Sequence, residues 1–452
     1  NTVDISRYSL WNYYLPPYQA AVNAGSATVM NSFNIVDGIP ASANKYLVSE
    51  VLKKRWNFKG FVVSDWGSFA ETILHGYAVD KADAAEKCFL AGSDMDMESR
   101  VLLENLESLV NKGIISLSRL DDAVTRILYY KFKLGLFEDP FRFCNEEREM
   151  KNQMTKSNIN IARLAGSKSM VLLKNDNNTL PLSKSQKNLM VAGFLADSKE
   201  DVLDFWKAQG EDKHTVTILQ GIKNKLPDAI ISYAQGYDSN LKTSELLLKE
   251  LKSKALVADV VIAVIGISGK NAGEARCLAD IAPSSGQMAM LNALKATGKK
   301  VIVVVQAGRP MILTEVDKKF PAILNAWIGG SEHGNAVADI IFGDFNPSAK
   351  TVISFPYLMG QIPVYYNHYN TGRPHKDGDE GPDAFWVSRY RDIQNAPLYP
   401  FGHGLSYSTF EYGDLKISNS SIKKNESTEL SLSIKNTSQR AGEEIVQLYI
   451  RD

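Results

Sequence analysis

The chain has 452 residues, of which 44% are hydrophobic and 23% are charged, the balance of a globular protein with packed cores. A chain of this length typically forms about three domains. Lysine and arginine number 51, as do aspartate and glutamate. The sequence therefore gives no net charge that would favour nucleic acid or an anionic membrane as a partner.

Metal and disulfide chemistry find little support in the composition. The three cysteines, Cys88, Cys144 and Cys277, are far apart and form no CxxC motif. The six histidines include no HxxxH or HExxH pair, so we expect no metal site. No apolar run approaches the ~18 residues that span a bilayer, so we expect no membrane insertion.

The first 140 residues alternate short apolar runs with amphipathic segments, which is typical of βα units. Strands are expected over 27–33 and 60–64, and the run 93–97 follows a helix. Helices are expected over 43–56, 81–91 and 118–135. About three units are visible, whereas a (β/α)8 barrel has eight. Residues 1–140 therefore fit the C-terminal portion of such a barrel, with the first units upstream of Asn1.

Residues 141–157 are polar and charged and are interpreted as a linker. A second α/β region is expected over 158–356, and its β-branched strands favour a mostly parallel sheet that is covered on both faces. Its expected strands are 170–173, 189–192, 260–265, 300–305 and 322–324. Its expected helices are 244–255, 286–296 and 334–342.

The last hundred residues change character twice. Residues 357–406 are rich in Gly, Pro, Tyr, Asn and His and are expected to form a long loop, and loops of this length are usually functional or disordered. Residues 407–452 alternate apolar and polar positions, with strands expected over 429–434 and 445–450. This pattern indicates the opening strands of a β-sandwich that is cut short.

Two carboxylates stand at places where chemistry could occur. Asp65 ends an apolar strand in the run Ser-Asp-Trp-Gly, at the rim where barrel enzymes keep their active sites, although an Asp there can also cap the next helix. Glu274 lies in the Gly-rich loop Gly266-Ile-Ser-Gly-Lys-Asn-Ala-Gly-Glu274, although a loop glutamate is often only solvated. That loop lacks the Ser or Thr after Lys270 that a phosphate-binding P-loop requires, and GxGxxG is absent, so we expect no nucleotide cofactor.

Ordered motifs along nearly the whole chain resemble glycoside hydrolase family 3, in particular its periplasmic β-glucosidase type. The motifs that carry the resemblance are LPPYQAAV (15–22), VMNSFNIVDG (29–38), GFVVSDWG (60–67), AGSDMDM (91–97), GRP (308–310), AWIGG (326–330), FGDFNP (342–347), GQIPVYYNH (360–368) and YPFGHGLSY (399–407).

The resemblance implies a (β/α)8 barrel, an α/β sandwich and a fibronectin type III-like domain, in that order, with the N-terminal barrel portion and the C-terminal end missing. It also implies a retaining, exo-acting β-glycosidase with Asp65 as nucleophile and Glu274 as general acid/base, followed by Asp280. Such an enzyme works by double displacement between two carboxyl groups. The family usually has Arg where Leu278 stands.

Further residues are candidates for substrate contact. The resemblance associates Trp66, after the nucleophile, with glucosidases, whereas xylosidases typically carry Cys there; the alternative is a core aromatic. Met30, Ser32 and Phe33 on the preceding strand are expected to border the same pocket, and the family commonly has Tyr where Phe33 stands. Arg389 and Tyr390 are candidates for the rim of the +1 subsite.

Three other interpretations stay open at this point. The chain could be a non-catalytic or incomplete carbohydrate-binding fragment, because the barrel's first units are missing. It could be a β-xylosidase of the same family, or a nucleotide-binding α/β protein. The expected partners are a β-glucoside or oligosaccharide substrate, the missing barrel segment and, as an open option, a second copy in a homodimer. Location in the periplasm or secretion is expected from the resemblance alone.

Overall fold

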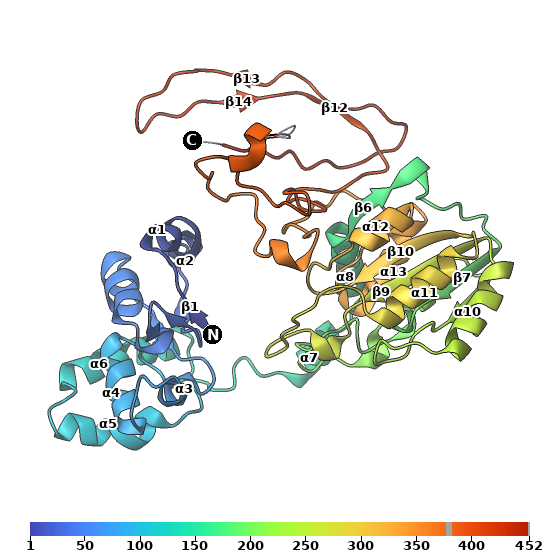
Figure 1. Cartoon of the computed structure of the whole chain (residues 1–452). Coiled ribbons are helices and arrows are strands. Elements are labelled where there is room, and N and C mark those ends of the chain that lie inside the picture. The colour runs from blue at the N-terminus through green and yellow to red at the C-terminus, as the bar shows by residue number, and fades with distance from the viewer. Residues whose placement is uncertain (377–381, 451–452) are drawn as a thin grey trace. The chain divides into compact units, whose positions relative to one another are not determined.

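The computed structural model describes residues 1–376 and 382–450. The chain divides into two compact units, Asn1–Lys151 and Asn152–Asp452 (Figure 1). Within the described residues, none of the helices combines the length and the apolar character that crossing a membrane requires.

In the first unit, two of the expected strands lie side by side. Strand β2 (Thr28–Met30) pairs in parallel with β5 (Phe61–Val63), and Val63 forms a further parallel bridge to Met95. A small separate sheet, which the sequence did not predict, contains β1 (Thr2–Val3), β3 (Ile35–Val36) and β4 (Ile39–Pro40). The described strands of this unit do not close into a barrel. The partial barrel therefore stays a prediction.

Helices of the first unit follow the amphipathic segments. Helix α4 (Lys81–Ala91) has the predicted bounds, because Asp80 caps its first turn and Gly92, with φ +111°, ends it. The prediction of a helix over 118–135 is confirmed by α6 (Leu117–Lys133), and the segment 43–56 forms a π-helix, η3 (Tyr46–Arg55). The other helices are α1 (Arg7–Ser9), η1 (Leu10–Tyr14), α2 (Leu15–Asn23), α3 (Ser68–Leu74) and α5 (Val101–Asn111).

The segment predicted as a linker contains regular structure. Helix α7 (Glu146–Asn152) lies within it, and α8 (Lys156–Ser169) begins inside it. Helix α7 buries none of its residues, and its acidic first turn suits the positive end of a helix dipole. A helix with no apolar face gives no periodic signal in the sequence, so the polar composition of this segment predicts a linker instead.

The second unit contains a six-stranded sheet in the order β6-β11-β10-β9-β7-β8. All neighbours are parallel except β6, which runs antiparallel to β11, so the expected mostly parallel sheet is confirmed. Strand β8 was not predicted. The bounds are β6 (Val171–Asn175), β7 (Asn188–Ala192), β8 (Ile230–Ala234), β9 (Val260–Gly266), β10 (Lys300–Gln306) and β11 (Ala322–Asn325).

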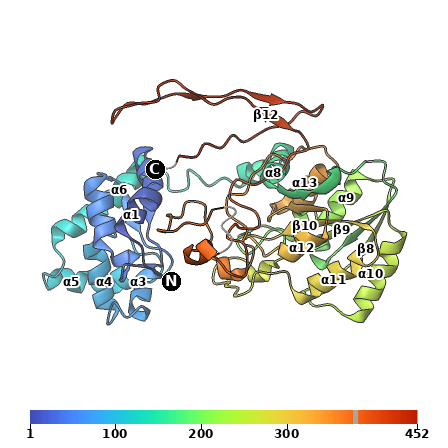
Figure 2. The same cartoon turned by 45° about the horizontal axis from the view of Figure 1, so that its top comes forward.

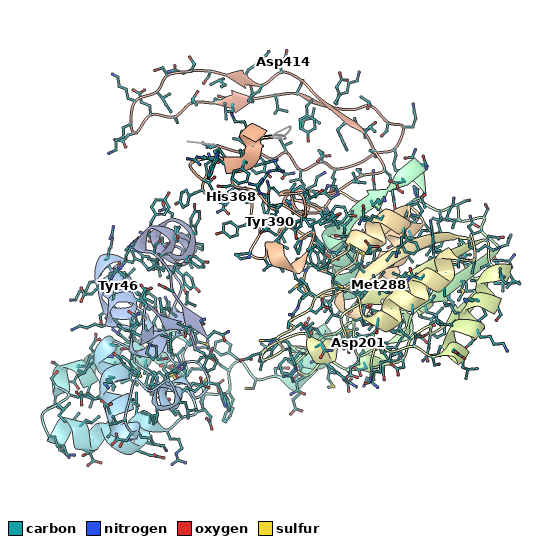
Figure 3. All side chains as sticks on the ribbon, in the orientation of Figure 1. Tyr46, Asp201, Met288, His368, Tyr390 and Asp414 are labelled. Atoms are coloured by element: carbon teal, nitrogen blue, oxygen red, sulfur yellow. The ribbon has the colours of Figure 1, made fainter. Side chains whose placement is uncertain are left out.

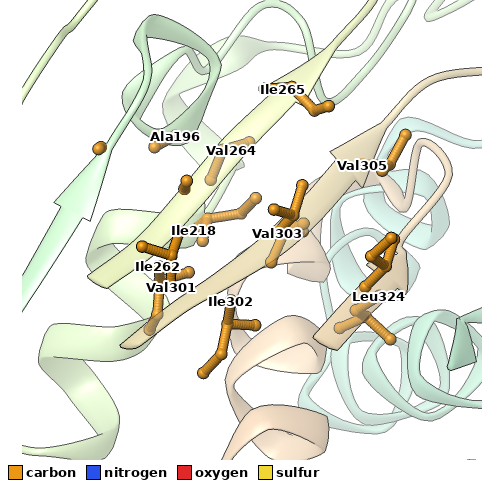
Figure 4. Close-up of a cluster of buried hydrophobic side chains, with 14 of the residues drawn as sticks. Ala196, Ile218, Ile262, Val264, Ile265, Val301, Ile302, Val303, Val305 and Leu324 are labelled. Carbon is orange, nitrogen blue, oxygen red and sulfur yellow. The ribbon is translucent and has the colours of Figure 1, made fainter. Parts of the chain in front are cut away.

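Helices cover both faces of this sheet (Figure 2). One layer contains α8, α9 (Ile218–Lys225) and α13 (His333–Ile341), and the other contains α10 (Glu245–Val257), α11 (Ser285–Lys295) and α12 (Thr314–Lys319). The central strands β9 and β10 are buried along nearly their whole length (Figure 4). Burying such β-branched runs on both faces supplies the core of the unit.

One buried carboxylate joins the three helices of the first layer. Asp339 on α13 accepts two hydrogen bonds from Arg163 of α8, at 2.6 and 2.7 Å, and one from Lys225 of α9. Burial alone would raise the pKa of Asp339, but these two cations outweigh it and hold the pKa below its usual value. The ionised form of Asp339 therefore stabilises this layer.

The remaining chain is mostly irregular. Residues predicted to open a β-sandwich form two antiparallel pairs, β12 (Phe410–Tyr412) with β15 (Ile434–Asn436) and β13 (Lys416–Ile417) with β14 (Leu430–Ser431). The prediction of a strand over 445–450 is wrong: these residues pair with no described strand, and Ile450 is 91% exposed. Short 3-10 helices are η2 (Ala41–Ala43), η4 (Asp176–Asn178), η5 (Phe194–Asp197), η6 (Asp212–His214), η7 (Gly269–Asn271), η8 (Gly330–Glu332), η9 (Met359–Gln361) and η10 (Pro382–Trp386).

Candidate active site

The backbone that carries Asp65 is fixed at the end of β5. Ser64 is fully buried, and its N–H donates to the Met95 carbonyl at 2.8 Å. Ser64 Oγ accepts from the N–H of Met97 at 2.7 Å and donates to the Asp65 carbonyl at 2.9 Å. The strand end and the 95–97 segment therefore hold Asp65 in place together.

The Asp65 carboxylate does not cap a helix. Helix α3 has Gly67 as its N-cap, with φ +71° and no side-chain capping bond. Among the described residues, the Asp65 carboxylate accepts one hydrogen bond, from the N–H of Trp66 to Oδ1 at 2.7 Å. The capping alternative is wrong, and Oδ2 has no protein partner in the described part of the chain.

Trp66 is not a core aromatic. Its residue is 65% exposed, so the indole contributes little to the packing of the first unit. Trp66 therefore leaves an apolar plane exposed to solvent directly after a half-exposed carboxylate.

A buried polar network lies behind this strand end. Ser93 Oγ lies within hydrogen-bond distance of two acceptors, Asn31 Oδ1 at 3.1 Å and the Ser42 carbonyl at 2.9 Å, which share its one proton. The hydroxyls of Ser42 and Ser68 are 2.8 Å apart. All four residues are less than one-tenth exposed. Satisfied buried networks of this kind restrict local motion, so the network adds to the rigidity of the Asp65 support.

A second buried group holds the flank of β5. Asp94 accepts from the N–H of Val62 at 2.9 Å and forms ion pairs with Lys53 at 2.6 Å and Arg119 at 3.0 Å. Burial lowers the pKa of Lys53, against the opposing influence of Asp94. The Asp94 carboxylate therefore links β5 to η3, which carries Lys53, and to α6, which carries Arg119.

The other predicted residues of the first unit are only partly brought together. Met30, which ends β2, and Ser32 line an apolar cavity of about 370 Å³ with Val29, Leu52 and other residues of β2, η1, α2 and η3. Phe33 and Asp65 are not among the lining residues. The expectation that Met30, Ser32 and Phe33 border one pocket around the nucleophile therefore stays a prediction.

The loop that carries Glu274 begins at the carboxyl end of β9. Gly266 passes so close to the Gln306 backbone that a side chain would not fit, and its carbonyl accepts from Gln287 Nε2 at 2.9 Å. Asp201, only 6% exposed, accepts from Ser268 Oγ at 2.8 Å and from the N–H of Gly269 at 2.6 Å (Figure 3). Asp201 therefore anchors the start of the loop.

Further along, the loop is held by an arginine. Arg309 Nη2 donates to the carbonyls of Asn271, at 3.4 Å, and Arg276, at 3.2 Å, on either side of Glu274. Glu274 itself is exposed, and its carboxylate makes no hydrogen bond or ion pair with any described residue. The side chain is therefore accessible to a ligand. This geometry fits a catalytic glutamate and equally a glutamate that is only solvated.

The departure at Leu278 has a local explanation. Leu278 is half-buried and packs against the hydrophobic core of the second unit, a place that suits an apolar side chain. The carboxylate of Asp280 accepts from the N–H of Ala282 at 2.9 Å and so closes the turn that ends the loop.

Two aromatic residues that the sequence analysis did not single out lie beside this loop. A side chain on Gly273 would come within 2.6 Å of Phe205 Cβ, so Phe205 packs directly against the residue before Glu274. Phe205 is 43% exposed and its neighbour Trp206 is 68% exposed. A Phe-Trp pair within the polar stretch 197–214 was the signal that could have identified them.

The structure separates Arg389 from Tyr390. Tyr390 lines a cavity of about 620 Å³ with Tyr365, Tyr366 and His368, and its hydroxyl donates to the Gly360 carbonyl at 3.2 Å (Figure 3). Arg389 is not among the lining residues, and its Nε is buried without a hydrogen-bond partner among the described residues.

Comparisons with known proteins give the family. The model of the glycosyl hydrolase family 3 N-terminal domain matches residues 1–130, and that of the family's C-terminal domain matches residues 170–407. The chain belongs to glycosyl hydrolase family 3. This membership removes the nucleotide-binding alternative and confirms the resemblance that the motifs carried.

Relatives within the family include both β-glucosidases and β-xylosidases. The chain is 40% identical to a periplasmic β-glucosidase of Salmonella typhimurium, over all of this chain and 62% of the relative. It is 36% identical to a β-xylosidase of Formosa agariphila, over 99% of this chain and 62% of the relative. The crystal structure of a β-glucosidase from Listeria innocua is 38% identical with a TM-score of 0.91, covering 98% of this chain and 60% of that one. The chain thus spans about three-fifths of the length of these relatives.

Proposed function

We propose that this chain acts as a retaining, exo-acting β-glucosidase that releases terminal glucose from β-glucosides and oligosaccharides. The observation that carries the proposal is the Asp65 carboxylate, rigidly held at a strand end and yet not used as a helix cap. A carboxylate that the fold holds in place, but that takes part in no helix cap or ion pair, suits a nucleophile. Family membership and the β-glucosidase relatives support the same reaction.

The chemistry assigns one role to each carboxyl group. Asp65 attacks the anomeric carbon while Glu274 gives its proton to the leaving glycosidic oxygen, which forms a glucosyl ester and releases the aglycone. Glu274 then takes a proton from water, which attacks the anomeric carbon and frees Asp65. Retaining enzymes bring their two carboxyl groups roughly 5–5.5 Å apart for this sequence. The proposal therefore requires Asp65 and Glu274 to act on one bound sugar.

Aromatic side chains are proposed to select the sugar and its aglycone. Trp66 supplies a plane for the glucose that reacts with Asp65, and the exposed pair Phe205 and Trp206, beside the Glu274 loop, supplies a second apolar surface. Arg389 and Tyr390 are proposed for the +1 side. The Formosa agariphila relative favours a β-xylosidase as the second candidate, and rates on aryl glucoside and aryl xyloside decide between them.

The proposal also covers the domain architecture, the location and the assembly of the protein. Residues 1–140 are proposed to be the C-terminal portion of a (β/α)8 barrel, and 407–452 the start of a fibronectin type III-like domain. Periplasmic or secreted location, completion by an N-terminal barrel segment and a homodimer are proposed with them. Because the chain spans about 60% of its relatives, an incomplete fragment that binds sugar without turnover is the non-catalytic alternative.

A mechanism-based label tests the function directly. A 2-deoxy-2-fluoro-glucosyl donor traps the glucosyl ester, and peptide mass spectrometry should find the adduct on Asp65. The Asp65→Asn variant should take no label, whereas Glu107→Gln, which changes an exposed carboxylate on α5, should label normally. An adduct elsewhere refutes the role of Asp65. No adduct, together with calorimetric binding of glucose, supports the non-catalytic alternative.

A further inference from the structure

Positive charge gathers at one place on the second unit, although the whole chain is electrically balanced. A cavity of about 520 Å³ is lined by six lysines and a single carboxylate, Asp176. The lysines come from separate segments: Lys174 is the last residue but one of β6, Lys295 ends α11, Lys299 precedes and Lys300 begins β10, and Lys318 and Lys319 end α12. We call this the lysine cavity.

Helix ends explain only half of this set. Cations are favoured at the carboxyl end of a helix, where the dipole is negative, and Lys295, Lys318 and Lys319 occupy such ends. The other three lysines are not at helix ends. Lys174 and Lys300 lie on strands and Lys299 lies directly before β10, so the helix dipole does not explain why a cation stands at these positions. Their convergence therefore has no explanation in local helix stability.

Nearby carboxylates neutralise the cavity only in part. Lys174 lies 3.2 Å from Asp176 and 3.7 Å from Asp317, and Glu315 pairs with Lys318 at 3.0 Å and Lys319 at 3.5 Å. The Glu315 pairs lie at the surface, where ion pairs are weak, so an incoming anion displaces them easily. The Lys174 side chain is more buried, and its pairs are the harder ones to displace.

The other three lysines lack carboxylate partners. Lys295 Nζ donates to the Lys319 carbonyl at 2.8 Å, and Lys299 and Lys300 form no ion pair with any described carboxylate. Six ammonium groups against the three carboxylates of Asp176, Glu315 and Asp317 leave a net positive charge in a concave site. Concave sites with one sign of charge concentrate the opposite ion.

The lysine cavity lies far from the Glu274 loop. In the parallel sheet, Lys300 is in register with Val260 and Gln306 with Gly266. The cavity is lined by Lys300 at the amino end of β10, whereas the loop leaves the carboxyl end of the neighbouring strand β9. Strands rise about 3.3 Å per residue, which puts about 20 Å between the two edges. A ligand in the cavity therefore does not compete with one at Glu274.

We propose that the lysine cavity binds an acidic polysaccharide, a polymer with repeated sulfate, phosphate or carboxylate groups. Several unpaired cations in one cavity match closely spaced anions better than a single ion. The lining residues include no arginine, and their one aromatic, Phe320, is 2% exposed, whereas sites for single-stranded nucleic acid use exposed aromatics. The choice of a polysaccharide over other polyanions rests on the proposed glycosidase function, but the charge argument does not.

Calorimetric titration with dextran sulfate at low salt tests the proposal without any need for hydrolysis. Double replacement Lys299→Glu/Lys300→Glu should weaken binding at least about tenfold, and wild-type affinity should fall steeply with added salt. The matched control Lys249→Glu/Lys252→Glu makes the same charge change on exposed positions of α10 and should bind like wild type. Thermal melting confirms that both variants are folded.

Four results would overturn the proposal. Three of them are no binding of dextran sulfate by the wild-type chain, an equal loss of binding in the α10 control, and tighter binding of a single-stranded oligonucleotide than of dextran sulfate. Inorganic phosphate that competes as well as the polymer, at equal anion concentration, would also overturn it, because the site would then hold a single ion. Failure of the Asp65 label would leave all four measurements interpretable, since none depends on turnover.

Discussion

The two carboxylates proposed for catalysis stand on supports of different kinds. Asp65 follows the buried Ser64 at the end of β5, above a network of buried hydroxyls. Glu274 lies well beyond the end of β9, on an exposed loop that Asp201 holds at its start and Arg309 on either side of the glutamate. A nucleophile must meet one carbon atom in line, whereas an acid/base group must reach a leaving oxygen and later a water. The difference in rigidity matches that difference in task.

Removing the nucleophile should give the largest effect. Asp65→Gly should lower kcat/KM on aryl glucosides by about 10⁴-fold or more, because no covalent intermediate can form. Azide should restore part of the rate by attacking from the vacated face, with α-glucosyl azide as the product identified by NMR. A β-glucosyl azide, or an unchanged rate, would refute the role of Asp65.

Loss of the acid/base group should depend on the leaving group. Glu274→Gly should slow hydrolysis of oligosaccharides by about 10²–10⁴-fold, because their poor leaving groups need a proton. Activated aryl glucosides should still glucosylate Asp65, and azide should then yield β-glucosyl azide with retained configuration. Glu245→Gln, an exposed carboxylate on α10, is the matched control. Equal losses on good and poor leaving groups would contradict the assignment.

Local signals predicted the regular elements of both units well. Helix α4 was predicted to the residue because Asp80 and Gly92 mark its ends, and β9 and β10 were evident from their β-branched runs. Asp65 could be placed at a strand end because the apolar run stops there. These features depend on neighbours in sequence, which a single chain displays.

Features that depend on contacts through space could not be predicted. Asp201 anchors a loop far along the chain and leaves no pattern at either position. The Phe205-Trp206 pair is visible in the sequence, but the packing of Phe205 against Gly273 is not. The alternation over 445–450 resembled a strand, but a strand exists only where a partner supplies hydrogen bonds. The buried ion pairs of Asp94 and Asp339 are invisible for the same reason.

Acid should reveal how the second unit is held together. Asp339→Asn should lower the free energy of unfolding at pH 7 by about 1–3 kcal/mol, because Arg163 loses its ion pair while Lys225 keeps only the one with Asp344. The pKa of Asp339 is lowered in the folded state, so its contribution is present above the unfolded pKa of about 3.9 and is lost as pH falls through the folded value.

Melting temperatures measured from pH 7 down to pH 2 check that the contribution of Asp339 to stability is lost as the pH falls. The wild-type chain should lose stability below about pH 4, where the unfolded state takes up the proton first, and Asp339→Asn should lose less over the same range. Asp259→Asn, at an exposed position before β9, should follow the wild-type curve. A variant curve parallel to wild type would show that Asp339 contributes nothing through its charge.

The smallest effect should come from loosening the Glu274 loop. Asp201→Ala removes the acceptor for Ser268 Oγ and the Gly269 N–H, so amide hydrogen exchange over 268–276 should accelerate while the buried strands β9 and β10 stay protected. If the loop positions Glu274, kcat should fall about tenfold with little change in KM, since the ground-state contacts of the sugar remain. Asp201→Asn keeps one acceptor oxygen and should lie between wild type and Asp201→Ala. Unchanged exchange in the loop would mean that Arg309 and the packing of Gly273 on Phe205 hold it without Asp201, and the support of Glu274 would then be as rigid as that of Asp65.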